Sequence, residues 1–248
     1  IGTNGEIVIG SRRRLICCST AAGAAFEGAR IKFGMRAAAG AIDAVDIDED
    51  VRLHLISGDQ VAGICGTGLL DVVAELLRVG IIDRTGRILG PDEVPTLPEP
   101  LRRRIHRIDD SNDFVLAETS TNGEPVYLTQ RDVRELQLAK GAISAGIEIM
   151  KKELGITDDD IHEILLAGAF GNYIRRERAV AVGLLPASTL DRIRFVGNAA
   201  GVGARLVLLN RHCQDEAERI SRQVEYVELA GRADFQTTFS EAMFFPTS

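Results

Sequence analysis

Two apolar runs that each end in a glycine-rich loop constrain the fold of this chain more than any other feature. Residues 164–167 precede Gly168-Ala169-Phe170-Gly171-Asn172, and residues 193–196 precede Gly197-Asn198-Ala199-Ala200-Gly201. A helix pattern at 136–154 lies before the first run, and another follows the second. Buried strands that alternate with helices pair in parallel, because each helix returns the chain across the sheet. The pattern therefore predicts an α/β fold with parallel strands and covering helices.

The segments around this core predict further mixed elements. Residues 5–10 and 15–18 are typical of a β-hairpin, and residues 51–56 alternate in polarity as a strand does. After Gly66-Thr67-Gly68, apolar residues recur with a period of about 3.6. This spacing predicts a helix that ends at Gly80.

The middle and the end of the chain are less regular in sequence. Residues 83–125 are rich in Pro, Asp, Asn and Arg, so we expect an irregular insertion with one short strand at 114–117. Thr129 and Asp132 have the spacing of a helix capping box in front of the 136–154 helix. Residues 213–248 alternate between helix-like and strand-like stretches, which predicts a tail packed over the body.

Composition and charge exclude several classes of protein. The chain has 248 residues, of which 45% are hydrophobic, enough for one large domain or two small ones. Its net charge of −7 argues against nucleic acid as a partner. Arginines cluster at 12–14, 102–104 and 175–178, and the acidic residues spread around them predict solvated surface for each cluster. No apolar run approaches the roughly 20 residues that span a bilayer and no signal peptide is evident, so we expect no membrane partner and a cytoplasmic location.

The side chains that could bind a metal ion lack the spacing of metal ligands. The chain has four histidines and four cysteines, and no two of the cysteines are two to four residues apart. We therefore expect free thiols and no metal site, with Cys65 of most interest because it lies beside glycines. The four cysteines are Cys17, Cys18, Cys65 and Cys213.

Four glycine-rich elements offer sites for anionic oxygens. They follow strands or open helices, where backbone N–H groups and helix amino termini concentrate hydrogen-bond donors. Any single loop is as readily a plain turn, but four in one chain favour a nucleotide. Neither the P-loop spacing nor the Rossmann fingerprint is present. The elements are Gly2-Thr3-Asn4-Gly5, Gly66-Thr67-Gly68, Gly168-Ala169-Phe170-Gly171-Asn172 and Gly197-Asn198-Ala199-Ala200-Gly201.

A phosphate-binding hairpin followed by strand–glycine loops resembles the acetate kinase, sugar kinase, heat-shock 70 and actin superfamily. At finer grain the chain is similar to the carboxy-terminal ATPase domain of the reductive activators of corrinoid-dependent enzymes. This similarity covers nearly the whole chain, including residues 224–245. The stretches that match are IGTNGEIVIG, AAFEGARIKFGMRAAAGAI, GICGTGLLD, LQLAKGAI, ILLAGAFGNYI, VGLLP and VGNAAGVGA.

The resemblance implies a ribonuclease H-like mixed sheet with flanking helices across residues 1–248, the second half of an actin/hexokinase-type ATPase. It implies ATP or ADP with Mg²⁺, and a 2Fe–2S cluster in an amino-terminal domain that precedes this chain together with the first ATPase half. The complete protein would use ATP to restore cob(I)amide in the corrinoid protein of a methyltransferase system. ATPase activity is expected only of that full-length protein.

Two other functions remain open from the sequence. One is a small-molecule kinase of the same superfamily that phosphorylates a sugar or a carboxylate. The other is a non-catalytic nucleotide-binding or dimerisation module, and a homodimer is left open as well. Because fold-level kinship does not separate these functions, the matched motifs decide in favour of the corrinoid activator.

The matched motifs also assign candidate site residues. Glu6 and Glu27 are the carboxylates nearest the phosphate loops and are candidate catalytic groups, with exposed surface as the alternative. Arg30, Lys32 and Arg36 are candidate contacts to the corrinoid protein, with a lid as the alternative. The predicted nucleotide-binding residues are Gly2, Thr3, Asn4, Gly5, Gly66, Thr67, Gly68, Gly168, Ala169, Phe170, Gly171, Asn172 and Asn198.

Three residues near these motifs allow two interpretations each. Asn198 either binds nucleotide or caps the helix that follows it. Tyr173 either stacks near the adenine or closes the core. Lys140 lies on an apolar helix face, so we expect its amino group to snorkel to solvent or to form an ion pair.

Overall fold

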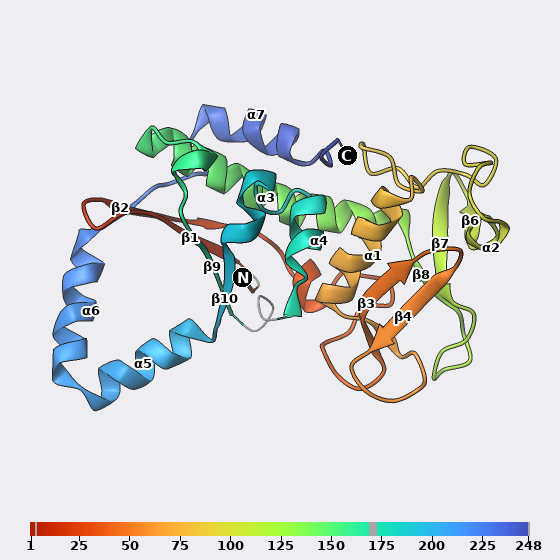
Figure 1. Ribbon diagram of the computed structural model, residues 1–248, viewed down its shortest axis with the longest axis horizontal. Helices are drawn as coiled ribbons and strands as arrows, with labels where there is room; N and C mark the ends of the chain where they lie inside the picture. The colour runs from red at the N-terminus through yellow and green to blue at the C-terminus, as the bar shows by residue number, and fades with distance from the viewer. Residues whose placement is uncertain (3, 169–172, 248) are drawn as a thin grey trace.

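The structure is a computed structural model that describes residues 1–2, 4–168 and 173–247. Figure 1 shows a long helix above a β-hairpin on one side, a second group of strands and helices on the other, and two helices that extend away from the body. The sheets are short, mixed in direction and covered by helices. This arrangement agrees with the predicted α/β fold.

The first sheet lies under the longest helix. β1 (Gly5–Gly10) and β2 (Leu15–Thr20) pair antiparallel, and β11 (Val224–Tyr226) adds to β2 in parallel. α3 (Gln130–Leu154) packs across β1 and β2, and α7 (Ala233–Ala242) packs on α3 (Figure 1). The predicted hairpin and the predicted 136–154 helix are therefore confirmed.

A second unit places α1 on the side of strand β3. β3 (Ala41–Ile47) pairs antiparallel with β4 (Val51–Leu55), and its first two residues pair in parallel with β5 (Gly63–Ile64). Within the described residues, β3 has no strand partner on the β5 side beyond Ile42. α1 (Gly66–Arg78) packs along β3 and ends just before Gly80, as its apolar spacing predicts (Figure 1).

The segment 83–125 contains more regular structure than the sequence predicts: the expected strand at 114–117 is confirmed, but the expectation that it is the single element is wrong. It contains α2 (Glu99–Arg103), β6 (Ile105–Ile108) and most of a three-stranded antiparallel sheet. β7 (Ser111–Ala117) is the central strand of that sheet, and β8 (Val126–Leu128) completes it. These strands are short, and β6 exposes His106, Arg107 and Ile108, which makes the segment resemble a loop in sequence. The buried apolar residues of the sheet are Ile105, Phe114, Val115, Leu116, Val126 and Leu128.

The parallel strand pair predicted from the glycine loops is present. β9 (Ile164–Ala167) and β10 (Ile193–Gly197) pair in parallel. α4 (Arg176–Ala181) lies between them in sequence. Two 3-10 turns, Asp158–Asp160 before β9 and Ala187–Arg192 before β10, complete the connection.

Two helices after β10 form an arm that extends from the body (Figure 1). Neither α5 (Ala199–Leu209) nor α6 (Arg211–Gln223) has a buried residue, so the expected packed tail is right for β11 and α7 but wrong for α6. Asn198 caps α5, since its Oδ1 accepts from the backbone N–H of Gly201 at 2.8 Å. No helix in the described part of the chain is long and apolar enough to cross a membrane.

Lys140 is a buried cation that binds the end of the chain to α3. Its residue surface is 1% exposed, and its Nζ donates to the carbonyl of Phe244 at 2.5 Å and lies 5.0 Å from the centre of the Phe245 ring. Burial lowers the pKa of Lys140 to about 8. Within the described residues Lys140 neither reaches solvent nor pairs with a carboxylate, so both expectations for its amino group are wrong.

A complete capping box fixes the start of α3. Thr129 Oγ1 accepts from the N–H of Asp132 at 3.0 Å, and Asp132 Oδ2 accepts from the N–H of Thr129 at 2.9 Å. The second carboxylate oxygen of Asp132 accepts from the N–H of Lys32 at 3.0 Å. The box therefore gives an acceptor to a free N–H group at the start of α3, and it also joins this helix to the 25–37 segment.

We expect Thr129→Ala to lower the free energy of unfolding by about 1 kcal/mol, because a buried N–H group of α3 loses its acceptor. Urea unfolding followed by circular dichroism measures this change. Thr157→Ala is the matched control, since Thr157 and Asp160 form the same box on an exposed 3-10 turn. An equal loss in both variants would show that burial of the α3 box adds nothing.

Candidate functional site

A cavity of about 700 Å³ is the main candidate for a ligand site. Its walls come from the amino-terminal residues, the 26–37 segment, β3, the end of β4 and the start of α1. A largely apolar cavity of this size with a few polar groups is ordinary for a small-molecule site. The lining residues are Ile1, Gly2, Phe26, Glu27, Met35, Arg36, Ala37, Asp43, Leu55, Ile56, Cys65, Gly66, Thr67 and Tyr173.

The structure brings only some of the predicted nucleotide-binding residues to this cavity. Gly2, Gly66 and Thr67 line it, and Gly68 follows them on α1. Four further residues lie outside its lining, namely Asn4, Gly5, Gly168 and Asn198. Five fall outside the described residues, namely Thr3, Ala169, Phe170, Gly171 and Asn172. The assignment of all thirteen to a nucleotide stays a prediction.

Packing requires glycine at some positions of the site and not at others. A Cβ atom at Gly66 would lie 2.0 Å from the carbonyl oxygen of Phe26, and one at Gly68 would lie 2.1 Å from a carbonyl oxygen of β3. These two glycines are therefore required for α1 to pack, whatever the cavity binds. At Gly2 the nearest atom to such a Cβ, among the described residues other than its chain neighbours, is Glu27 Oε1 at 4.0 Å. Among those residues, packing therefore does not require a glycine at this position.

The start of α1 presents hydrogen-bond donors at the cavity. Cys65 is the N-cap residue, and its N–H and its Sγ both donate to the carbonyl of Ile42, at 3.1 and 3.2 Å. The N–H groups of Gly66, Thr67 and Gly68 follow and have no acceptor inside the helix. Together with the helix dipole, these donors favour an anionic group.

Two carboxylates line the cavity, and one of them was not singled out from the sequence. Glu27 ends the 3-10 turn Ala25–Glu27. Asp43 lies on β3, and its Oδ1 is buried without a hydrogen-bond partner among the described residues. Glu6 is exposed on β1 and lies outside the lining, so only one of the two predicted catalytic carboxylates reaches the cavity. An acid within an alternating strand was the only sequence signal for Asp43.

The three cations proposed to contact a partner do not form one patch. Arg30 lies 3.9 Å from Glu135 on α3. Lys32 donates to the hydroxyl of Tyr127 and lies 4.3 Å from the centre of that ring, and this hydrogen bond raises the pKa of Lys32. Arg36 lines the cavity instead. A role for these residues in binding a partner stays a prediction.

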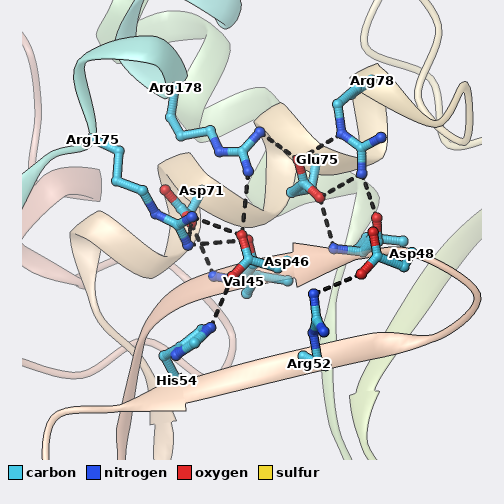
Figure 2. Close-up of polar contacts among 11 residues, drawn as sticks. Val45, Asp46, Asp48, Arg52, His54, Asp71, Glu75, Arg78, Arg175 and Arg178 are labelled. Atoms are coloured by element: carbon cyan, nitrogen blue, oxygen red, sulfur yellow. Dashed lines mark hydrogen bonds and ion pairs between the residues drawn. The ribbon is translucent and has the colours of Figure 1, made fainter.

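A cluster of charged side chains lies between α1, β3 and α4, beyond the part of α1 that lines the cavity (Figure 2). Its members are Asp46, Asp71, Glu75, Arg78, Arg175 and Arg178. Two carboxylates of α1 accept from the free edge of β3. Asp71 Oδ2 accepts from the N–H of Val45 at 2.9 Å, and Glu75 Oε2 accepts from the N–H of Ile47 at 2.7 Å. Asp71 and Glu75 are 2% and 1% exposed, so their charges require partners.

Arginines that lie on or directly before α4 supply those partners (Figure 2). Arg175 lies 2.5 Å from Asp71 Oδ2 and 2.7 Å from Asp46 Oδ1. Arg178 pairs with Glu75 and lies 3.4 Å from Asp46. One guanidinium thus bridges a helix and a strand, which its planar set of five donors permits.

The carbonyl groups of the same strand edge are also bound by arginines. Arg175 donates to the carbonyl of Val45 at 3.2 Å, and Arg78 donates to the carbonyl of Ile47. Arg78 also lies 2.7 Å from Glu75. The ion cluster therefore hydrogen-bonds both N–H and C=O groups of an edge that has no neighbouring strand there.

The two aspartates of the cluster titrate in opposite directions. The hydrogen bond from Arg175 is the main cause that lowers the pKa of Asp46 to about 2. Burial raises the pKa of Asp71 to about 6, because removal of its carboxylate from water outweighs the hydrogen bond from Val45 and the attraction of Arg175.

The expectation of solvated surface is wrong for two of the arginine clusters. The side chains of Arg175 and Arg178 are 33% and 18% exposed and pair with buried acids, although Arg176 is exposed. Arg104 is also 18% exposed, and it binds Asp50 and two backbone carbonyls. The partners of Arg175 lie 129 and 104 residues earlier in the chain, so local sequence gives no signal for them.

A family model described as the C-terminal domain of RACo, the ASKHA domain, matches residues 1–248. The corrinoid activation enzyme RamQ of Eubacterium limosum is 36% identical over 244 residues, which are 96% of this chain and 41% of that protein. A Co(II) methylated amine-specific corrinoid protein reductase of Methanosarcina barkeri is 28% identical over 246 residues, 90% of this chain and 40% of that protein.

A solved structure is similar over almost the whole chain. It is a reductive activator for a corrinoid, iron–sulfur protein, with a TM-score of 0.88 and 39% sequence identity. The match covers 99% of this chain and 39% of that one. The chain thus spans about two fifths of the length of the relatives it matches.

The raised pKa of Asp71 predicts a pH dependence of stability. Between about pH 4, its value in an unfolded chain, and pH 6, the folded state holds a proton on Asp71 that the unfolded state has lost. The contribution of Asp71 to stability is therefore present at low pH and is lost as the pH rises through 6. We expect wild type to lose about 2 kcal/mol relative to Asp71→Asn between pH 4 and pH 7.

Urea unfolding of both proteins at pH 4, 5, 6 and 7 measures this difference. Asp48→Asn is the control, because Asp48 forms an exposed pair with Arg52 and its removal should leave the pH profile unchanged. Parallel profiles for wild type and Asp71→Asn would contradict the raised pKa.

Proposed function

This chain belongs to the family of the C-terminal ASKHA domain of RACo, and on that premise we propose that it is the nucleotide-binding domain of an ATP-dependent reductive activator of a corrinoid protein. The names of the similar proteins support this function. The structural observation that supports it most is the cavity at the start of α1. There, helix N–H groups, an open glycine and two carboxylates meet beside an apolar lining.

The cavity provides separate environments for the parts of a nucleotide. Phosphate oxygens would accept from the first N–H groups of α1, with Gly2 leaving room for the phosphate chain. The apolar lining would take the nucleoside, with the exposed Tyr173 at its edge. Helix N–H groups and an apolar lining in one cavity would therefore orient the nucleotide.

The two carboxylates of the cavity suit Mg²⁺. This ion prefers carboxylate oxygens and keeps several of its waters, and Asp43 has a buried oxygen that no donor of the described residues reaches. Glu27 and Asp43 would hold Mg²⁺, most simply through its waters. When bound, the ion neutralises phosphate charge.

The cysteines do not suit an iron–sulfur cluster. Cys65 lies at the cavity, Cys213 lies on the arm, and all four cysteines are free. The described residues contain no group of three or more metal-ligating side chains. We therefore place the cluster in a part of the full-length protein outside this chain.

In the proposed reaction the nucleotide acts as a switch and does not supply the electron. The cluster, bound in another part of the full-length protein, would supply the one electron that reduces cob(II)amide to cob(I)amide in the partner. ATP binding or hydrolysis assists by favouring the conformation in which that transfer occurs, which requires that the nucleotide bind the two conformations with different affinity.

ATP turnover of the full-length protein tests the function. We expect turnover to rise when a corrinoid protein in the cob(II)amide state is added, and to stay unchanged when sugars or carboxylates are added. Turnover that depends on a small molecule and yields its phosphate ester would instead identify a kinase. Binding of Mg-ATP without turnover in any mixture would identify a non-catalytic module.

Gly2→Ala tests the position of the phosphate chain. Among the described residues other than its chain neighbours, the nearest atom to the new methyl group is 4.0 Å away, so we expect the free energy of unfolding to change by less than about 0.5 kcal/mol. It would enter the space assigned to phosphate, and we expect Mg-ATP affinity in the full-length protein to fall at least about tenfold. Isothermal titration calorimetry measures the affinity.

The matched control is Gly203→Ala on α5. A Cβ at Gly203 also meets no atom within 4 Å, but Gly203 lies outside the cavity lining. This variant should bind Mg-ATP as wild type does. Equal Mg-ATP affinity in wild type and Gly2→Ala would contradict the assignment of the phosphate chain to the space beside Gly2.

A further inference from the structure

We propose that Arg175 and Arg178 are positioning residues for the cavity. Their ion pairs hold the Tyr173 segment, β3 and the start of α1 in the arrangement that binds ligand. The inference rests on the proposed function only in taking a nucleotide as that ligand.

The first connection runs through α1. Thr67 lines the cavity, Asp71 follows it by one helical turn, and Glu75 follows by one more. The three side chains therefore lie along the same side of one helix. Because the helix moves as a unit, a guanidinium that fixes Asp71 also fixes the N–H groups that face the cavity.

The second connection runs through the residues that precede α4. Tyr173 lines the cavity, and Arg175 follows it by two residues. Ile174, between them, is 3% exposed and packs in the core. Arg175 is the N-cap residue of α4, and its guanidinium, which has no acceptor for the helix N–H groups, binds the cluster.

The third connection runs through β3. Asp43 lines the cavity, and Asp46 lies three residues later on the same strand and binds both arginines. Three structural elements that contribute lining residues thus meet in one ion cluster (Figure 2). None of the six residues that form this cluster lies in the lining itself.

The geometry of this cluster matters more than its charge. A buried ion pair adds little net stability, because desolvation offsets the attraction between the charges. A guanidinium, however, fixes several acceptors at defined angles, and Arg175 binds Asp71, Asp46 and the Val45 carbonyl together. A lysine would keep the charge and lose this arrangement.

Arg175→Lys and Arg175→Met in the full-length protein test the proposal. We expect Arg175→Lys to weaken Mg-ADP binding about tenfold, measured by calorimetry where circular dichroism shows a folded protein. We also expect iodoacetamide to alkylate Cys65 about fivefold faster, measured by mass spectrometry of its peptide, because Cys65 is the buried N-cap of α1. Arg175→Met should show larger effects of both kinds.

Two comparisons separate positioning from general destabilisation. Arg52 lies on β4 of the same β3–β4 hairpin, and Arg52→Met breaks only its exposed pair with Asp48, so this variant should change neither readout. In a Tyr173→Ala background, Arg175→Lys should cost less affinity than in wild type, since part of its effect acts through Tyr173.

The outcomes distinguish this proposal from the proposed function. A folded Arg175→Lys protein with wild-type Mg-ADP affinity and a wild-type rate of Cys65 alkylation would overturn the positioning role. Should Arg175→Met not fold, the result for Arg175→Lys alone is the test. If wild type binds no Mg-ADP, the nucleotide assignment fails. In that case faster alkylation of Cys65 still supports the positioning role, and an unchanged rate overturns it.

Discussion

The open edge of β3 is the constraint on which this half of the structure depends. Beyond Ile42 no strand of the described residues pairs with it on that side, yet its N–H and C=O groups lie in the interior, where unpaired groups are costly. Asp71 and Glu75 accept from the N–H groups. Arg78 and Arg175 donate to the carbonyls. Charged side chains therefore make the hydrogen bonds to this edge that a neighbouring strand would otherwise make.

This solution to the edge determines how distant parts of the chain pack. α1 is buried along almost its whole length, so its two carboxylates lie in the interior and need positive partners. Arg78 comes from the same helix, whereas Arg175 and Arg178 come from residues about 100 positions later. The segment after β9 must therefore dock against α1. The strand edge, the helix and α4 form one unit for this reason.

Sequence reasoning succeeded where local patterns determine structure. The hairpin, α1, α3 with its capping box and the parallel pair β9–β10 all follow from spacing within one segment. In the sheet at 105–128 it predicted only the strand at 114–117, because β6 and β8 are strands of four and three residues set among polar and turn-forming residues. It missed the ion cluster because the tertiary fold sets the partners of those side chains, and it missed Asp43 because only the fold places that residue at the cavity. The grouping of glycines found the cavity only in part, since Gly66 and Gly68 have packing reasons of their own.

The GICGTGLLD stretch shows how a motif can serve a site mainly through packing. Cys65 binds the carbonyl of Ile42, and Gly66 and Gly68 let α1 approach its neighbours closely. Asp71, at the end of the stretch, binds β3 and Arg175. Only Thr67 combines a polar side chain with a place in the cavity and no contact to the strand edge. Most of the motif therefore fixes the direction of a helix, and the ligand meets the backbone N–H groups that this direction exposes.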